Sequence, residues 1–142
     1  MATIRELVLG RLRRWRMTTI FGDPGSTEPS FLRDLPEDFR YVLGLQEAAV
    51  VGMADAHAQV TGTPTLVALH STAGLGHATG AILNAARNKT PLVITAAADD
   101  TAEPDPLLAH AAVKWAGTAT RAEDVPAALA RARLIADTPP RG

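Results

Sequence analysis

The sequence contains no cysteine, which excludes disulfide bonds, thiolate metal sites and cysteine nucleophiles. Aromatic residues are also scarce, at 4% of the chain, so alanine, valine, leucine and isoleucine must fill most of the core. No apolar run reaches the roughly 18 residues that a membrane span requires. The N-terminus carries Arg5 and Glu6 and lacks the apolar core of a signal peptide, so we expect a cytoplasmic protein.

The chain also has no excess of positive or negative charge, because its formal net charge is −1. This balance gives no electrostatic argument for a nucleic-acid partner or an anionic membrane. One basic cluster falls at the end of a predicted helix, where cations favour the helix dipole and stay solvated: Arg11, Arg13, Arg14 and Arg16. We therefore expect neither nucleic acid nor a membrane as partner.

The chain has 142 residues, which is room for one domain, and no repeat or linker divides it. Its apolar spacing predicts alternating helices and strands. The expected helices cover residues 3–15, 28–35, 46–60, about 77–87 and 124–136, and the expected strands 17–21, 39–43, 65–69, 91–96 and 113–118. This order predicts a three-layer αβα domain, with a mainly parallel sheet covered by helices on both faces.

Ligands of such sheets bind beyond the carboxyl ends of the strands. The loops after Phe21, Leu43, Leu69 and Ala96 are therefore the candidate site loops. Three of them carry polar pairs: Asp23 and Ser26, Gln46 and Glu47, His70 and Ser71. The stretch 97–106 is rich in acidic residues and proline and predicts a solvated loop.

Each candidate also has a structural interpretation. Glu47 falls in a first helical turn, where a carboxylate favours the helix dipole, but its apolar neighbours indicate a buried carboxyl beside a cleft. His70 fits a satisfied hydrogen-bonding residue, with Ser71 as cap of the next helix, and Ser26 fits a helix cap. Ser26 also lacks the Gly-x-Ser-x-Gly context of a nucleophile elbow.

The sequence lacks the usual motifs for binding a metal, a dinucleotide or a phosphate group. The four histidines show no metal-ligand spacing, and His57 and His110 carry no other signal, so we expect no metal site in this chain. Gly74, Gly76 and Gly80 do not match a dinucleotide fingerprint, and no Walker motif is present. Phosphate binding by this chain alone is unsupported.

Three segments are more informative together than apart. They are Thr19-Ile-Phe-Gly-Asp-Pro-Gly-Ser-Thr-Glu28, Leu45-Gln-Glu-Ala48 and Leu69-His-Ser-Thr-Ala-Gly74. In this order they resemble the N-terminal pyrimidine-binding domain of thiamine diphosphate-dependent decarboxylases and carboligases, most closely the benzoylformate decarboxylases. Residues 31–41 and 113–115 add to a resemblance that covers nearly the whole chain.

The resemblance implies the thiamine diphosphate-binding fold and a set of roles. Glu47 would hydrogen-bond N1′ of the cofactor's aminopyrimidine, and Pro24 and Gly25 would lie against the cofactor. His70 would carry protons to and from reaction intermediates, and Ser26 would hold the carboxylate of a 2-oxo acid substrate. The sequence alone does not identify which 2-oxo acid.

The resemblance also implies missing parts. Family members bind the diphosphate through Mg²⁺ with a Gly-Asp-Gly…Asn motif in another domain, and this sequence has none. The segment 97–112 is shorter than in the family, His77 replaces an asparagine, and the chain stops at residues 139–142, where the family begins its last strand. We therefore expect a diphosphate-binding partner domain or subunit, self-association into a homo-oligomer, and no turnover by the chain alone.

Three interpretations remain open at this point. The chain is half of a split enzyme, or a stand-alone or remnant domain that acts as a non-catalytic binding or assembly module, or a fragment of a longer enzyme. Retention of Glu47, His70 and Ser26 together favours the first. The short segment and the early end favour the second.

Overall fold

The structure is a computed structural model that describes residues 2–26, 28–97 and 112–142. The helices are α1 (Ile4–Arg14), α2 (Pro29–Leu32), α3 (Glu47–Thr61), α4 (Ser71–Arg87) and α6 (Val125–Asp137), with a 3-10 turn at Ala122–Asp124. The strands are β1 (Thr19–Asp23), β2 (Arg40–Leu43), β3 (Thr65–Leu69) and β4 (Leu92–Ala96). Helices and strands alternate, as the sequence predicts.

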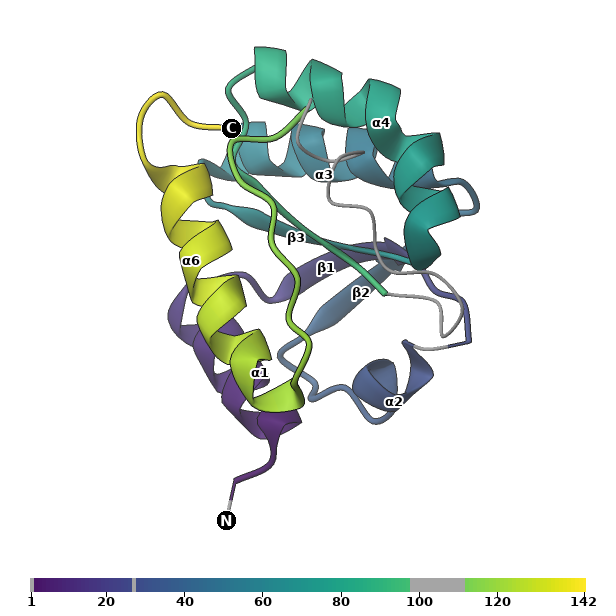
Figure 1. Cartoon of the computed structure of the whole chain (residues 1–142), viewed down its shortest axis with the longest axis vertical. Helices are drawn as coiled ribbons and strands as arrows, with labels where there is room; N and C mark the ends of the chain where they lie inside the picture. Colours follow the sequence, from purple (N-terminus) through teal and green to yellow (C-terminus); the bar gives the residue numbers. More distant parts are fainter. Residues whose placement is uncertain (1, 27, 98–111) are drawn as a thin grey trace.

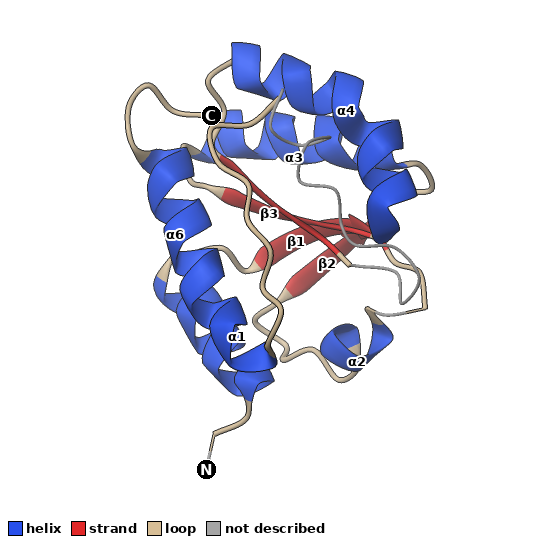
Figure 2. Ribbon diagram, in the orientation of Figure 1, coloured by secondary structure: helices blue, strands red, loops and turns tan. Residues whose placement is uncertain are grey.

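The four strands form one parallel sheet in the order β2-β1-β3-β4. Within it, Gly22 of β1 lies opposite Leu43 of β2 and Ala68 of β3. Figure 1 shows α3 and α4 covering one face of the sheet and α1 and α6 covering the other, and Figure 2 shows the same layers by element type. The predicted three-layer α/β architecture is confirmed.

Each face of the sheet has its own apolar cluster. Ile20 and Leu66 pack with α1 and α6, whereas their neighbours Phe21 and Val67 pack with α3 and α4. Successive strand residues point to opposite faces, so a strand covered on both sides must be apolar at every position. The continuous apolar run of β3 therefore predicted its bounds without error.

The capping residues expected from the sequence are also found at the ends of two helices. Thr3 and Glu6 form a reciprocal capping box at the start of α1. Gly62 ends α3 in the left-handed conformation, with φ +68. Among the described residues, no helix is both long and apolar enough to cross a membrane.

Several expected elements begin or end elsewhere; α4, for example, starts at Ser71 rather than at about residue 77. The first strand runs over residues 19–23 rather than 17–21, because the amide of Met17 still donates to the carbonyl of Leu12 at the exit of α1 (2.9 Å). α2 has only four residues rather than the expected 28–35. Arg33 already has extended backbone and Asp34 has φ +50, so the chain leaves the helix well before Pro36.

The strand expected over residues 113–118 was wrong. A strand needs a neighbouring backbone about 4.8 Å away, and residues 113–118 form no ladder: within the ranges that the structure describes, β4 is the edge strand and pairs only with β3. β4 and residues 112–119 line a common cavity of about 450 Å³. The side chain of Lys114 attaches residues 113–118 to α6 instead. The ammonium of Lys114 donates to the carbonyls of Ile135 (2.6 Å), Thr138 (2.7 Å) and Pro140 (2.8 Å) at the end of α6.

Candidate functional site

The candidate residues gather at the edge where the four parallel strands end. Because the strands run in one direction, the loops after β1, β2 and β3 meet there. They lead into α2, α3 and α4, so the first turns of these helices border the same edge. The acidic stretch expected at 97–106 and His110 lie outside the described residues, apart from Ala97.

Glu47 is the first residue of α3, and its side chain is 18% exposed. It lies against the first turn of α4: a Cβ added to Gly74 would be 3.1 Å from Oε1 of Glu47. Gln46 precedes it as the helix cap, with its Oε1 accepting from the amide of Ala49 (2.9 Å). The carboxylate is therefore held between two helix N-termini, where the dipoles of both favour its negative charge.

His77 also reaches Glu47. Its Nδ1 lies 3.3 Å from Oε2 of Glu47, and its side chain is 67% exposed. The sequence left the direction of His77 open, and the structure places it facing Glu47. A pair this exposed contributes about 1 kcal/mol or less to stability, so its significance lies in occupying one oxygen of Glu47.

His70 directly follows β3 and occupies the N-cap position of α4. Its ring lies beside a second carboxylate, that of Glu28. Its Nδ1 lies 3.2 Å from Oε2 and 3.4 Å from Oε1 of Glu28. The same Oε2 accepts from the amide of Gly25 (2.9 Å). A Cβ added to Gly25 would be 2.2 Å from the His70 ring, so the backbone of Gly25 lies directly against the imidazole.

Ser71 does not cap α4, contrary to expectation. It is the first helical residue, is buried, and has φ +60, a conformation that costs a non-glycine residue of order 1–3 kcal/mol. The cap position belongs to His70, which makes no side-chain capping bond. Such strain is retained where the surrounding structure over-determines the backbone, and here it sits beside His70.

Tyr41 of β2 adds a buried hydroxyl near this edge. Its oxygen has no hydrogen-bond partner among the described residues. A Cβ on Gly22 would be 2.2 Å from this oxygen and 2.7 Å from the carbonyl of Ala68, so only glycine fits at position 22. Burial raises the pKa of Tyr41 to about 12, with further contributions from the negative charges of Glu28 and Asp23. Asp23, another candidate, is the last residue of β1.

The other candidates are placed less specifically. Ser26 is exposed and Pro24 half-buried, both in the loop between β1 and α2. Glu28 was not predicted as a site residue, although it ends the first family-like segment. His57 has a structural role as expected: its Nδ1 meets Oγ1 of Thr65 (3.0 Å) and its ring packs on Phe21. No group of acidic residues and histidines in the described ranges could hold a metal ion.

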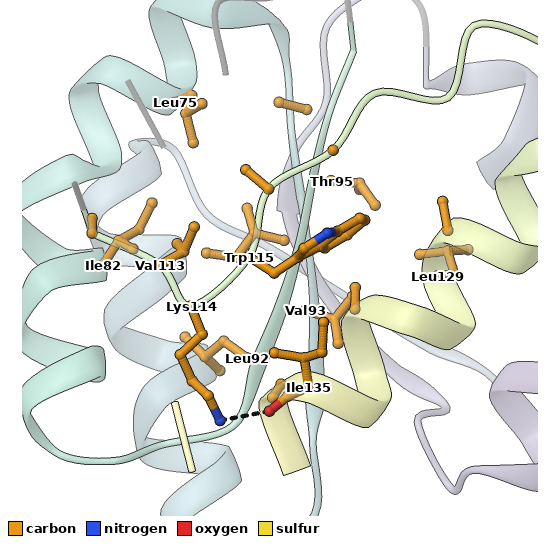
Figure 3. A pocket seen from close by; sticks show the side chains of 18 of the residues that line it. Leu75, Ile82, Leu92, Val93, Thr95, Val113, Lys114, Trp115, Leu129 and Ile135 are labelled. Carbon is orange, nitrogen blue, oxygen red and sulfur yellow. Dashed lines mark hydrogen bonds between the residues drawn. The ribbon is translucent and has the colours of Figure 1, made fainter. Parts of the chain in front are cut away.

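One cavity of the domain lies away from these residues. It is the space of about 450 Å³ beside β4, and none of the candidate residues lines it. Figure 3 shows its apolar lining, with Trp115 and Val93 among the side chains and Lys114 bonded to Ile135. A second cavity of about 410 Å³ includes Glu28 but is otherwise mostly apolar. Neither of these two cavities is lined by Glu47, His70 or Ser26.

An aminopyrimidine fits this edge chemically. It presents a ring nitrogen and an amino group, and Glu47 offers a partly exposed carboxylate that can hydrogen-bond a ring nitrogen. Gly74 and Gly25 lie close against Glu47 and His70, since a Cβ at either position would crowd these side chains. Nothing comparable is available for a diphosphate with Mg²⁺ in the described part of the chain, since it offers no cluster of metal ligands.

Known proteins resemble the chain over its full length. Benzoylformate decarboxylase of Pseudomonas aeruginosa is 45% identical over 156 aligned residues, which cover 99% of this chain and 29% of that protein. The structure of the thiamine diphosphate-dependent 4-hydroxybenzoylformate decarboxylase of Rhodococcus jostii matches with 42% identity and a TM-score of 0.93, over 99% of this chain and 29% of that one. The crystal structure of benzoylformate decarboxylase from Polynucleobacter necessarius matches with 42% identity and a TM-score of 0.90, over 100% of this chain and 29% of that one.

The chain thus spans about 29% of the length of these relatives, which contain further domains. The family model described as the thiamine pyrophosphate enzyme, N-terminal TPP binding domain, matches residues 2–122. With a match this long and relatives this similar, the chain belongs to the thiamine pyrophosphate enzyme family and is a form of its N-terminal TPP binding domain.

Proposed function

We propose that this chain is the pyrimidine-binding part of a thiamine diphosphate-dependent 2-oxo acid decarboxylase or carboligase, which acts together with a separate diphosphate-binding domain. The observation that carries the proposal is the position of Glu47 at the N-terminus of α3, partly exposed and backed by Gly74 of α4. Glu47 would hold the ring nitrogen N1′ of the aminopyrimidine and exchange a proton there. The cofactor supplies the electron sink that decarboxylation needs.

The other residues act on the substrate side. His70 would accept and return protons, since imidazole is the side chain best suited to proton transfer near neutral pH. Ser26, exposed in the loop after β1, would hold the substrate carboxylate with its hydroxyl. Pro24 and Gly25 of the same loop would lie against the cofactor, and Gly25 permits this because it has no side chain.

The partner domain supplies what the described residues lack. It would bind the diphosphate through Mg²⁺, and it would come from another part of a longer chain or another subunit. The 29% coverage of the relatives supports such a division. We further propose that residues 1–142 form one domain and that this domain self-associates. A stand-alone, non-catalytic binding module is the alternative.

The test uses the chain itself, labelled with ¹⁵N and titrated with thiamine diphosphate and Mg²⁺. We expect binding in the millimolar range, about −4 kcal/mol, with amide shifts confined to residues near Glu47 and Gly74. Glu47→Gln should remove these shifts without unfolding the chain. The matched control is Glu37→Gln, which neutralises an exposed carboxylate elsewhere and should leave the shifts intact.

Two outcomes would overturn the proposal. Shifts that persist in Glu47→Gln would remove Glu47 from the cofactor site. Absence of any shift at millimolar cofactor, together with no gain of 2-oxo acid decarboxylation when a diphosphate-binding domain of the family is added, would favour the non-catalytic module.

A further inference from the structure

We infer that Glu28 is the positioning residue for His70: its carboxylate accepts a hydrogen bond from Nδ1–H and so makes Nε2 the proton-accepting nitrogen of the ring. The two residues are 42 positions apart in the sequence, and the pairing of β1 with β3 brings their loops together. The catalytic consequence rests on the proposed function, whereas the pair itself does not.

The direction of the hydrogen bond follows from the acceptors. A carboxylate has no hydrogen to donate, so with Glu28 ionised the proton between the two groups belongs to Nδ1. Both oxygens of Glu28 face Nδ1, at 3.2 and 3.4 Å. The amide of Gly25 donates to Oε2 at 2.9 Å, and a backbone donor of this kind favours the ionised carboxylate.

The residues around His70 restrict the orientation of its ring as well as the position of its proton. Glu28 is 11% exposed and His70 31% exposed, so water competes only weakly for the contact. The backbone of Gly25 lies against the ring and leaves no space for a Cβ. Ser71, held at φ +60, fixes the backbone that carries the ring.

The pair gives His70 a defined chemistry. In neutral imidazole one nitrogen carries the proton and the other the lone pair, and the hydrogen bond made by one decides the role of the other. With Nδ1 as donor, Nε2 carries the lone pair. When Nε2 takes up a proton, the carboxylate of Glu28 stabilises the imidazolium that forms, as a carboxylate does for the histidine of a catalytic triad. Glu28 is thus placed to act through His70 without contacting the substrate.

The test is the tautomer of His70, read from the ring ¹⁵N shifts of the full chain without cofactor, at a pH where imidazoles are neutral. The wild type should show Nδ1–H over Nε2–H by about tenfold, the preference expected of a hydrogen bond to a charged acceptor. Glu28→Gln should reduce that ratio to about one. His70→Asn assigns the signals.

Two internal controls accompany the measurement. The tautomer of His57, whose Nδ1 contacts Thr65, should not change in Glu28→Gln. Glu37→Gln changes the same charge at an exposed position and should leave His70 as in the wild type. If Glu28→Gln does not fold, Gly25→Ala serves instead, because its methyl group would overlap the ring of His70 and displace it from its present contact with Glu28, which should lower the ratio too.

An Nε2–H tautomer in the wild type would overturn the inference, and so would an Nδ1–H preference that is unchanged in Glu28→Gln or, where that variant does not fold, in Gly25→Ala. Because the cofactor is absent from this experiment, its result does not depend on whether thiamine diphosphate binds. Failure of the cofactor titration and failure of the Glu28–His70 pair are therefore separate outcomes.

Discussion

Replacing Gly74 by alanine would add a methyl group beside the carboxylate of Glu47, and this contact can be measured as a stability difference. The new Cβ would lie 3.1 Å from Oε1, 3.5 Å from Cγ and 3.7 Å from Cδ of Glu47. The first distance is a few tenths of an ångström too short, so Glu47 must move. Moving it would break its 3.3 Å contact with His77.

Two effects of similar size oppose each other at this position. Glycine to alanine within a helix stabilises by about 1 kcal/mol. The loss of the contact between Glu47 and the exposed His77, together with an altered side-chain rotamer, costs about 1 kcal/mol. Gly76 separates the effects, because it lies in the same helix, is exposed, and has nothing within 4 Å of its added Cβ. The Gly76→Ala variant should therefore be more stable than the wild type by the full difference in helix propensity, about 1 kcal/mol.

We expect Gly74→Ala to be about 1 kcal/mol less stable than Gly76→Ala, measured by urea unfolding with equal slopes. The amide shifts that thiamine diphosphate causes should weaken in Gly74→Ala and persist in Gly76→Ala. Equal stabilisation of the two variants would show that Glu47 swings aside at no cost. In that case Gly74 does not hold the carboxylate in place.

Two further predictions concern stability. Tyr41→Phe removes a buried hydroxyl that has no partner in the described part of the chain, so it should stabilise the chain by about 1 kcal/mol in urea unfolding; a loss of stability would mean that the hydroxyl is hydrogen-bonded after all. Arg13 donates two hydrogen bonds to Asp38 and thereby lowers the pKa of that carboxyl, so the stability it provides is present above the ordinary carboxyl pKa and is lost as the pH falls through the lowered value. Arg13→Gln should raise the pKa of Asp38 and flatten this acid dependence, and an unchanged carboxyl titration measured by NMR would contradict the assignment.

How much the sequence could predict depends on how local each signal is. β3 and the capping box of Thr3 were predicted correctly, because an apolar run and a three-residue spacing are complete within a few residues. Residues 113–118 were predicted as a strand but form none, because a strand also needs a partner backbone at the right distance and the sheet ends at β4. That distance is a tertiary property and cannot be predicted from the run itself.

The candidate site shows the same limit. The chain order of strands placed Glu47 and His70 at one edge of the sheet, since this follows from parallel topology alone. The contact between Glu28 and His70 depends on how the loops after β1 and β3 fold against each other. Its only sequence signal was the position of Glu28 at the end of a family-like segment, and the strained φ of Ser71 had none.

The chain has no cysteine and so no disulfide, but the ammonium of Lys114 links three distant carbonyls. They close loops of 21, 24 and 26 residues and so act as a non-covalent cross-link around α6. Closing a loop of that length costs on the order of 3 kcal/mol of chain entropy, which the hydrogen bonds at one nitrogen must offset. Acetylation of Lys114 would remove its charge and leave one N–H in place of three, so one nitrogen could no longer hold the three carbonyls together.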